Sequence, residues 1–421
     1  MFRFSKLSRC VVSLSAVAFV ASCTADTVNE VLGPKPTGTS AIFQSYVAIG
    51  NSITAGYQSS GISDATQQAA FPKLLATQMN TRYAYPSIAG RGCAPPIVNF
   101  QTRAGAGTIT ATQRDTICDL RTATSATDIL NNVAVPGASS YDPTTPTTPF
   151  SNILTSLFLG GKTQVQKALD AHPTFVTIWI GNNDVLGFAV GDSRANAPTG
   201  LLGMTSVTQF QTNYNAMLTQ LTAGAPGVKG VLIGVVQVAN APIMFPAAAM
   251  SNAAFKAGFD AIAGTTTLLD PSCLPGGAGA TSLINSLLPF QIRTGAHPAV
   301  VACVPRGAAG NFPATVGDIL VLDAAEQATV SARIDAYNAH IAAKANELGF
   351  AYLDPNPLLA TLKAANTVVR STPNYGSTTA TFGTGMSLDG VHPGAGVQRE
   401  IANALIPLIN TKYSTNLALV P

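Results

Sequence analysis

Residues 46–56 read YVAIGNSITAG, an apolar run that stops at a glycine and is followed by a serine among small residues. A short apolar run of this kind is typical of a buried strand, and we expect one over Ser45–Gly50. A helix-like segment follows, so Ser52 is expected in the turn between a strand and a helix. Such turns lie at the sheet edge where open α/β sheets bind ligands. A serine at such a turn is more often a helix cap than a nucleophile, so the rest of the chain has to decide its role.

The remaining chain alternates between short apolar runs and helix-like segments. Further strands are predicted over residues 133–135, Phe175–Ile180, Gly230–Val238 and Phe350–Leu353. Helical spacing of apolar residues is found over Phe71–Met79, Val165–Leu169, Phe210–Leu221, Ala324–Leu348 and Gly396–Ile409, and another apolar face begins at Phe150. This alternation predicts an α/β fold with a parallel central sheet covered by helices on both faces.

Two segments lack this alternation of strands and helices. Residues 91–127 and 241–317 are rich in Gly, Pro and Ala, and we interpret them as long irregular insertions that could wall a pocket at the sheet edge. The second insertion holds apolar stretches at 243–246 and 287–290, which either line an acyl pocket or form the core of the insertion.

The N-terminus predicts export. Residues 1–22 combine a basic leader with an apolar run that is too short to span a bilayer, which is typical of a signal peptide. Val20-Ala21-Ser22-Cys23 resembles a bacterial lipobox, which implies that Cys23 becomes the lipidated N-terminus; an ordinary secretory signal is the alternative. Residues 23–43 would then be the lipidated end and a flexible Pro/Gly-rich tether, and 44–421 the folded domain with 241–317 as its insertion. The predicted location is the bacterial cell envelope, on a periplasmic or outer-surface membrane face.

The charge balance argues against nucleic acid as a partner. Removal of residues 1–22 takes away three positive charges and no negative ones, so the formal net charge of +3 becomes 0. A neutral chain offers neither a phosphate-binding surface nor a polybasic membrane patch. We therefore expect contact with the membrane only through the lipid anchor.

Four cysteines remain beyond Cys23 in the exported chain. An even number in an oxidising compartment predicts two disulfides, for which three connectivities are possible. We favour the local pairs Cys93–Cys118 and Cys273–Cys303, one in each insertion. Metal binding is the alternative, but no CxxC motif or histidine cluster accompanies them, so no metal or cofactor is expected.

Three further short motifs fall just after predicted strands or before the last helix. They are the glycine in NVAVPGAS at 132–139, the GNND at 181–184, and the SLDGVHP at 387–393. Together with the Ser52 stretch, these motifs resemble, in order, the four blocks of the SGNH (GDSL-type) hydrolase family over about residues 44–409. The resemblance implies a three-layer α/β/α, flavodoxin-like fold. The sequence departs from the family's motif at Asn51, where the family usually has Asp. This difference concerns the residue that supports the turn and not the catalytic residues.

The chemistry of ester cleavage needs residue types of this kind. Ser52 would attack the ester carbonyl, His392 would take its proton, and Asp389 would fix the imidazole through its other ring nitrogen. The resemblance implies that the oxyanion is held by the backbone N–H groups of Ser52 and Gly137 and by the side-chain amide of Asn183.

The sequence thus predicts an exported serine esterase or lipase that acts on a small-molecule or lipid ester. A carbohydrate acetyl-esterase of the same fold, or a surface-binding lipoprotein without turnover, are the alternatives. An intact Ser52–Asp389–His392 set argues against a pure binding role. Acyl length, the alcohol moiety and oligomeric state are left open by the sequence.

Overall fold

A four-stranded parallel sheet forms the centre of the protein. In the computed structural model, which describes residues 38–88, 90–107, 129–146, 151–190, 203–303, 320–369 and 372–421, the strand order is β1-β2-β3-β9. The strands span Tyr46–Gly50 (β1), Phe175–Trp179 (β2), Lys229–Ile233 (β3) and Ala351–Leu353 (β9). Each pairs in parallel with its neighbour, so all four carboxyl ends lie at one edge of the sheet. The strands predicted at Ser45–Gly50, Phe175–Ile180 and Phe350–Leu353 are confirmed, and the one predicted at Gly230–Val238 ends earlier, at Ile233.

Residues 131–135 run along the free side of β1. The Val133 and Val135 N–H groups donate to the carbonyls of Ala48 and Gly50, and the Ala48 N–H donates to Asn131. Only an isolated bridge between Ala48 and Asn132 is formed, so this stretch is not a regular strand. It nevertheless carries Gly137 to the same sheet edge as Ser52.

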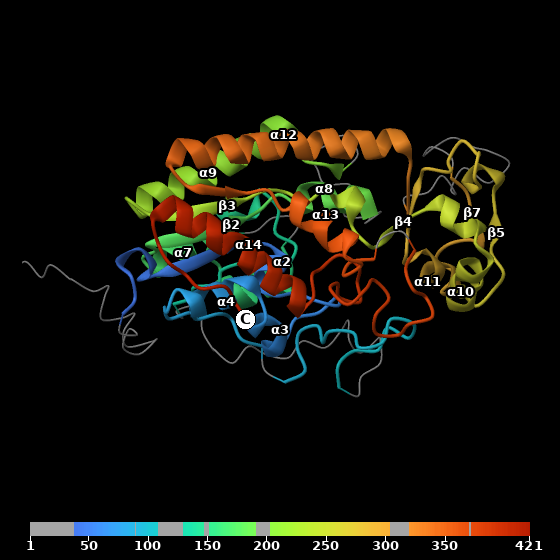
Figure 1. The fold of residues 1–421 in the computed structure, drawn as a ribbon, viewed down its shortest axis with the longest axis horizontal. Coiled ribbons are helices and arrows are strands. Elements are labelled where there is room, and N and C mark those ends of the chain that lie inside the picture. The colour runs from blue at the N-terminus through green and yellow to red at the C-terminus, as the bar shows by residue number, and fades with distance from the viewer. Residues whose placement is uncertain are drawn as a thin grey trace, which may run out of the picture.

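Helices cover both faces of the sheet (Figure 1). One face is covered by α6 (Ile153–Leu159), α7 (Gln164–Asp170), α8 (Asn183–Val190), α9 (Val207–Gly224) and α12 (Ala324–Leu348). The other is covered by α4 (Phe71–Gln78), α13 (Asn356–Ala364) and α14 (Ala395–Tyr413). Short helices at Ala41–Phe43 (η1), Ser52–Ala55 (α2), Asp64–Gln68 (α3), Asp142–Thr144 (η2) and Val238–Asn240 (η5) connect these elements. The two layers bury both sides of the sheet, which explains why its strands are almost entirely apolar.

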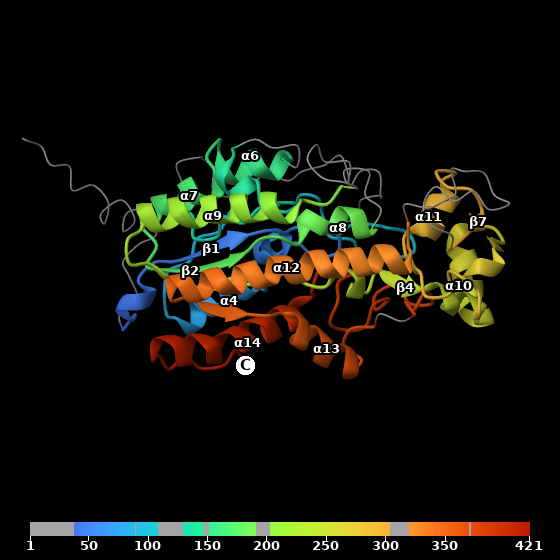
Figure 2. The ribbon, with the colours of Figure 1, turned by 90° about the horizontal axis from the view of Figure 1, so that it is seen from above.

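The region from Met244 to Cys303 forms a side lobe at one end of the sheet, as Figures 1 and 2 show from two directions. It contains α10 (Ala253–Ala263), α11 (Leu288–Arg293), η6 (Ala247–Ser251), η7 (Pro271–Cys273) and the pair β5 (Leu268–Leu269) and β7 (Val300–Val301). A small sheet of β4 (Met244–Pro246), β6 (Leu283–Asn285) and β8 (Val321–Leu322) joins it to the main body. The expectation that this segment is irregular was wrong, because its apolar side chains pack in a hydrophobic cluster together with residues from elsewhere in the chain. That the segment is an insertion stays a prediction.

Aromatic rings form the centre of that core. Phe245 and Phe259 pack around Tyr375, which comes from a distant part of the chain. Phe245 and Leu288 are fully buried and Phe290 is nearly so, and none of them lines either of the two pockets described below. Phe245, Leu288 and Phe290 therefore belong to the core of the lobe, whereas Ile243 and Met244 pack in the main core, and none of these residues lines the two pockets.

A disulfide joins Cys273 and Cys303 within the side lobe, as expected from the sequence. Cys93 is also disulfide-bonded. Its expected partner Cys118 lies outside the described residues, so that pairing stays a prediction. Cys23 and the rest of the N-terminal segment also lie outside them.

Within the described ranges, no helix has both the length and the apolar character that a membrane crossing requires.

Candidate active site

Ser52 is the first residue of α2, directly after β1. The side chain of Asn51 caps this helix by accepting the Ile53 N–H at 3.1 Å, and Gly56 ends it at φ +85°. Asn51 thus performs the capping task that a carboxylate oxygen would perform at this position. The short helix holds Ser52 at the carboxyl edge of the sheet, in a pocket that Asn182, Asn183 and His392 also line.

Ser52, His392 and Asp389 form a continuous hydrogen-bonded line. The Ser52 Oγ lies 2.8 Å from His392 Nε2, and His392 Nδ1 lies 2.8 Å from Asp389 Oδ2. The sequence places these residues 340 positions apart at most, and the fold brings them into direct contact. The expected meeting of Asp389 and His392 in one turn is what the structure contains, with Gly390 at φ +68° between them.

The Asp389 carboxylate accepts several hydrogen bonds besides that of the imidazole. Its Oδ1 accepts the N–H groups of Val391 and His392, both at 2.9 Å, and the Ser387 hydroxyl. Its Oδ2 accepts the Ser60 N–H at 2.7 Å. Burial alone would raise the pKa of Asp389, but the adjacent His392 ring and these hydrogen bonds outweigh burial and hold the pKa well below its usual range.

A turn at Ser59 and Ser60 supports the Asp389 loop and was not identified from the sequence. Gln58 and Gly61 exchange two backbone hydrogen bonds around it, and both serines have positive φ, 52° and 55°. The Ser59 N–H donates to Ser387 Oγ, and the Ser59 hydroxyl accepts the Leu388 N–H. A two-residue turn with positive φ at both positions usually carries Asn-Gly, so a Ser-Ser pair gave no recognisable signal.

The ring of Tyr57 covers His392. The two ring centroids are 5.0 Å apart and the planes meet nearly edge to face. This contact limits rotation of the imidazole and leaves its Nε2 directed at Ser52.

The three anion-binding donors expected from the sequence are the N–H groups of Ser52 and Gly137 and the Asn183 amide, and Asn183 lines the same pocket as Ser52. Gly137 has φ +87°, a conformation that strains any residue with a Cβ. Neither its N–H nor the Ser52 N–H donates to another residue in the described part of the chain. Asn183 begins α8 and donates one Nδ2 hydrogen to the Ala138 carbonyl at 2.8 Å. The Asn183 amide is thereby fixed beside the Gly137 loop.

Two buried carboxylates hold the loop that follows Gly137. Asp142 accepts from the N–H and hydroxyl of Ser139, and Asp184 on α8 accepts from the N–H and hydroxyl of Ser140 at 2.8 and 2.6 Å. Burial raises the pKa of Asp184 to about 6, although the Ser140 hydrogen bonds act in the opposite direction. Asp184 follows Asn183 in α8 and binds Ser140 in the loop after Gly137, so it links the helix that carries Asn183 to the loop that carries Gly137.

The other histidines have different surroundings. His340 Nε2 lies 3.0 Å from the Asn215 side chain, and His297 Nδ1 lies 2.7 Å from a backbone carbonyl. In the described ranges, no three His, Cys, Asp or Glu side chains are grouped so that they could hold a metal ion.

The family model described as GDSL-like Lipase/Acylhydrolase matches residues 46–405 of the chain. Among solved structures, an extracellular lipase from Streptomyces rimosus is 15% identical, with a TM-score of 0.35 and coverage of 88% of this chain and 99% of that chain. A catalytic mutant of an acetylxylan esterase from Geobacillus stearothermophilus is 11% identical, with a TM-score of 0.37 and coverage of 87% and 94%. At these scores neither likeness bears on the substrate. No curated protein matches the chain.

Proposed function

Because the chain belongs to the GDSL-like lipase/acylhydrolase family and is an ester hydrolase, we propose that it is an exported enzyme that cleaves carboxylic esters through an acyl-enzyme on Ser52. The observation that carries this proposal is the unbroken line of hydrogen bonds from Ser52 Oγ through His392 to Asp389. A nucleophile, a base within hydrogen-bond reach and a third group that orients the base are the parts that acyl transfer requires.

In the first step, Ser52 Oγ bonds to the ester carbonyl carbon while its proton passes to His392 Nε2. The bond between that carbon and the alcohol oxygen then breaks, and the alcohol leaves with the proton from His392. In the second step, water gives a proton to His392 and its oxygen attacks the acyl carbon. The bond to Ser52 breaks, Oγ regains the proton, and the free acid leaves.

The negative charge on the carbonyl oxygen would be held by the N–H groups of Ser52 and Gly137 and by the Asn183 amide. Support comes from the two backbone donors without partners in the described residues and from the fixed position of Asn183. Loss of one such donor typically costs about 3 kcal/mol of transition-state stabilisation.

Asp389 orients the imidazole and stabilises it when it carries the extra proton. The hydrogen bonds from Ser60, Val391 and the His392 backbone keep this carboxylate ionised and leave Oδ2 facing the ring. A carboxylate held in this way selects the tautomer in which Nε2 can accept the proton of Ser52.

A fluorophosphonate probe tests the acyl-enzyme directly. The serine mechanism predicts that the probe adds to one residue, and that peptide mapping by mass spectrometry finds the added mass on Ser52. Attachment should be lost in Ser52→Ala. Stoichiometric labelling at a different serine would overturn the proposal.

We further propose that Cys23 is lipidated and attaches the enzyme to a membrane of the bacterial envelope. The support is the short apolar signal followed by the lipobox-like Val20-Ala21-Ser22-Cys23. Metabolic labelling with a radioactive fatty acid should mark the wild-type protein and not Cys23→Ser. Equal labelling of both, or export of an unlabelled wild-type chain, would contradict the anchor.

A further inference from the structure

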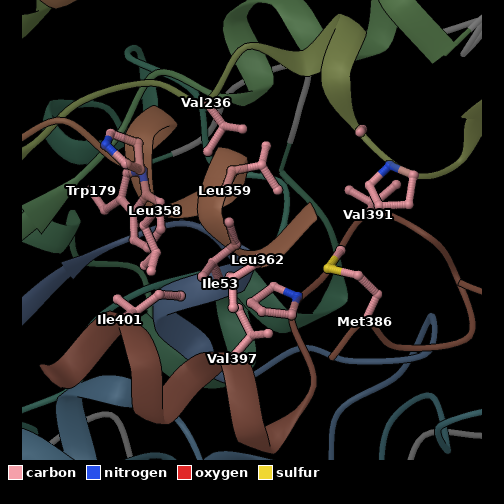
Figure 3. Close-up of a pocket in the computed structure, with 14 residues that line it drawn as sticks. Ile53, Trp179, Val236, Leu358, Leu359, Leu362, Met386, Val391, Val397 and Ile401 are labelled. Carbon is pink, nitrogen blue, oxygen red and sulfur yellow. The ribbon is translucent and has the colours of Figure 1, made fainter. Parts of the chain in front are cut away.

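An apolar pocket lies at the carboxyl edge of the sheet and is lined by Ile53, the residue after Ser52 (Figure 3). The space between its walls is about 530 Å³, a volume that includes open solvent. Its walls come from the residue after Ser52, from the end of β2, from the segment after β3, and from helices α13 and α14 (Ile53, Trp179, Val236, Leu358, Leu359, Ile401).

The pocket adjoins the site of the nucleophile. Ile53, Val236, Ala241 and Val391 line both the apolar pocket and the polar pocket that contains Ser52 and His392. The two spaces therefore lie next to one another and share part of their walls. No charged side chain lines the apolar space.

We propose that this pocket binds the acyl chain of the substrate, and that the enzyme selects esters whose acyl chains are longer than acetyl. This inference rests on the proposed acyl-enzyme at Ser52. An acetyl group bonded to Ser52 would leave the space between α13 and α14 unfilled, whereas a longer alkyl chain would replace water along apolar walls.

The apolar walls of the pocket favour the acyl side of the ester over the alcohol side. They include Leu362 on α13 and Ile401 on α14, both buried. An apolar space next to the nucleophile suits the group that stays bonded to Ser52 until water attacks. The alcohol has to leave after the first step, which requires an open path.

Burial of each additional methylene is worth about 0.8 kcal/mol, or up to about fourfold in kcat/KM where it counts fully in the transition state. With p-nitrophenyl esters, kcat/KM should therefore rise with acyl length from acetate until the pocket is full. A parallel series of acetate esters with longer alcohols should not show this rise.

Leu359 offers a variant that probes the pocket without disturbing a fully buried residue. It is half-buried on α13, and Leu359→Trp would fill the space while Leu359→Ala would enlarge it. The ratio of kcat/KM for octanoate to that for acetate should fall about tenfold or more in Leu359→Trp. In Leu359→Ala, the acyl length of highest kcat/KM should shift upward. The matched control is Ala360→Trp, which puts the same side chain on the exposed face of α13 and should leave the ratio unchanged.

The outcomes separate this inference from the proposed function. A flat acyl series, or a rise with alcohol length instead, in an enzyme that depends on Ser52 would overturn the acyl pocket and leave the serine mechanism standing. An equal ratio in wild type, Leu359→Trp and Leu359→Ala would also overturn it. If no ester is hydrolysed, or hydrolysis does not depend on Ser52, the proposed function fails and the pocket assignment fails with it.

Discussion

At the scale of single residues, Asp389 accepts more hydrogen bonds than the orientation of one imidazole requires. Besides His392 Nδ1, its two oxygens accept bonds from Ser387, the Ser60 N–H and two N–H groups of its own turn. The Asp-x-x-His spacing predicted the turn and the pairing with His392. It could not predict Ser60, because that contact joins segments 329 positions apart through a backbone N–H, which carries no side-chain signature.

Asp389→Asn should reduce kcat by about 10³–10⁴-fold. The amide would not hold the tautomer that accepts the Ser52 proton, nor would it stabilise the protonated ring. Steady-state hydrolysis of a p-nitrophenyl ester measures the loss, with circular dichroism as the control for folding. A loss below tenfold would show that Asp389 does not orient the base.

The same carboxylate links stability to pH. Its pKa is held below the ordinary value, so its contribution to the free energy of unfolding is present above about pH 4, the unfolded value, and is lost as pH falls towards the folded one. Urea unfolding from pH 6 down to pH 3 should show a steeper loss for wild type than for Asp389→Asn. Parallel curves would contradict this account of Asp389.

At the scale of elements, the strands and the long helices followed from apolar periodicity, but α13 did not. Pro355 and Pro357 suggest a break in the chain, yet Pro is well accommodated in a first helical turn, and Pro355 is in fact the N-cap of α13. The helices of the side lobe were missed for a different reason. Their Gly- and Pro-rich surroundings resemble loop sequence, and only packing of residues distant in the chain, such as Tyr375 on Phe245, stabilises them.

Asp184 connects two elements, the loop after Gly137 and helix α8. Its pKa is raised to about 6 by burial, so its contribution favours the folded state below about pH 4 and is lost as pH rises through about 6. As pH rises from 4 to 7, the free energy of unfolding of wild type should therefore fall relative to that of Asp184→Asn. A difference that stays constant over this range would show that Asp184 is not buried as described.

At the scale of the whole molecule, the protein combines a sheet that carries the site with a side lobe that has a separate core. The main body could be predicted from sequence because its strands are continuous apolar runs and its motifs follow them directly. The lobe core depends on long-range contacts, so only its cysteines and the apolar stretches at 243–246 and 287–290 gave a signal.

Removal of the Cys273–Cys303 disulfide should destabilise the protein, chiefly through the lobe. The two cysteines are 30 positions apart in the sequence. A disulfide that closes a loop of this length typically adds about 3 kcal/mol to the free energy of unfolding. The double variant Cys273→Ala, Cys303→Ala should unfold at lower urea concentration, or show an added early transition if the lobe unfolds alone. An unchanged unfolding curve would contradict a stabilising role.

The central claim is that Ser52 is the nucleophile, and hydrolysis of p-nitrophenyl acetate and butyrate by the purified protein and by Ser52→Ala tests it most directly. The account predicts turnover by the wild type and a loss of at least about 10⁴-fold in kcat in the variant, with the fold intact. Equal activity of the two proteins would contradict the assignment of Ser52, and with it the roles given to His392 and Asp389.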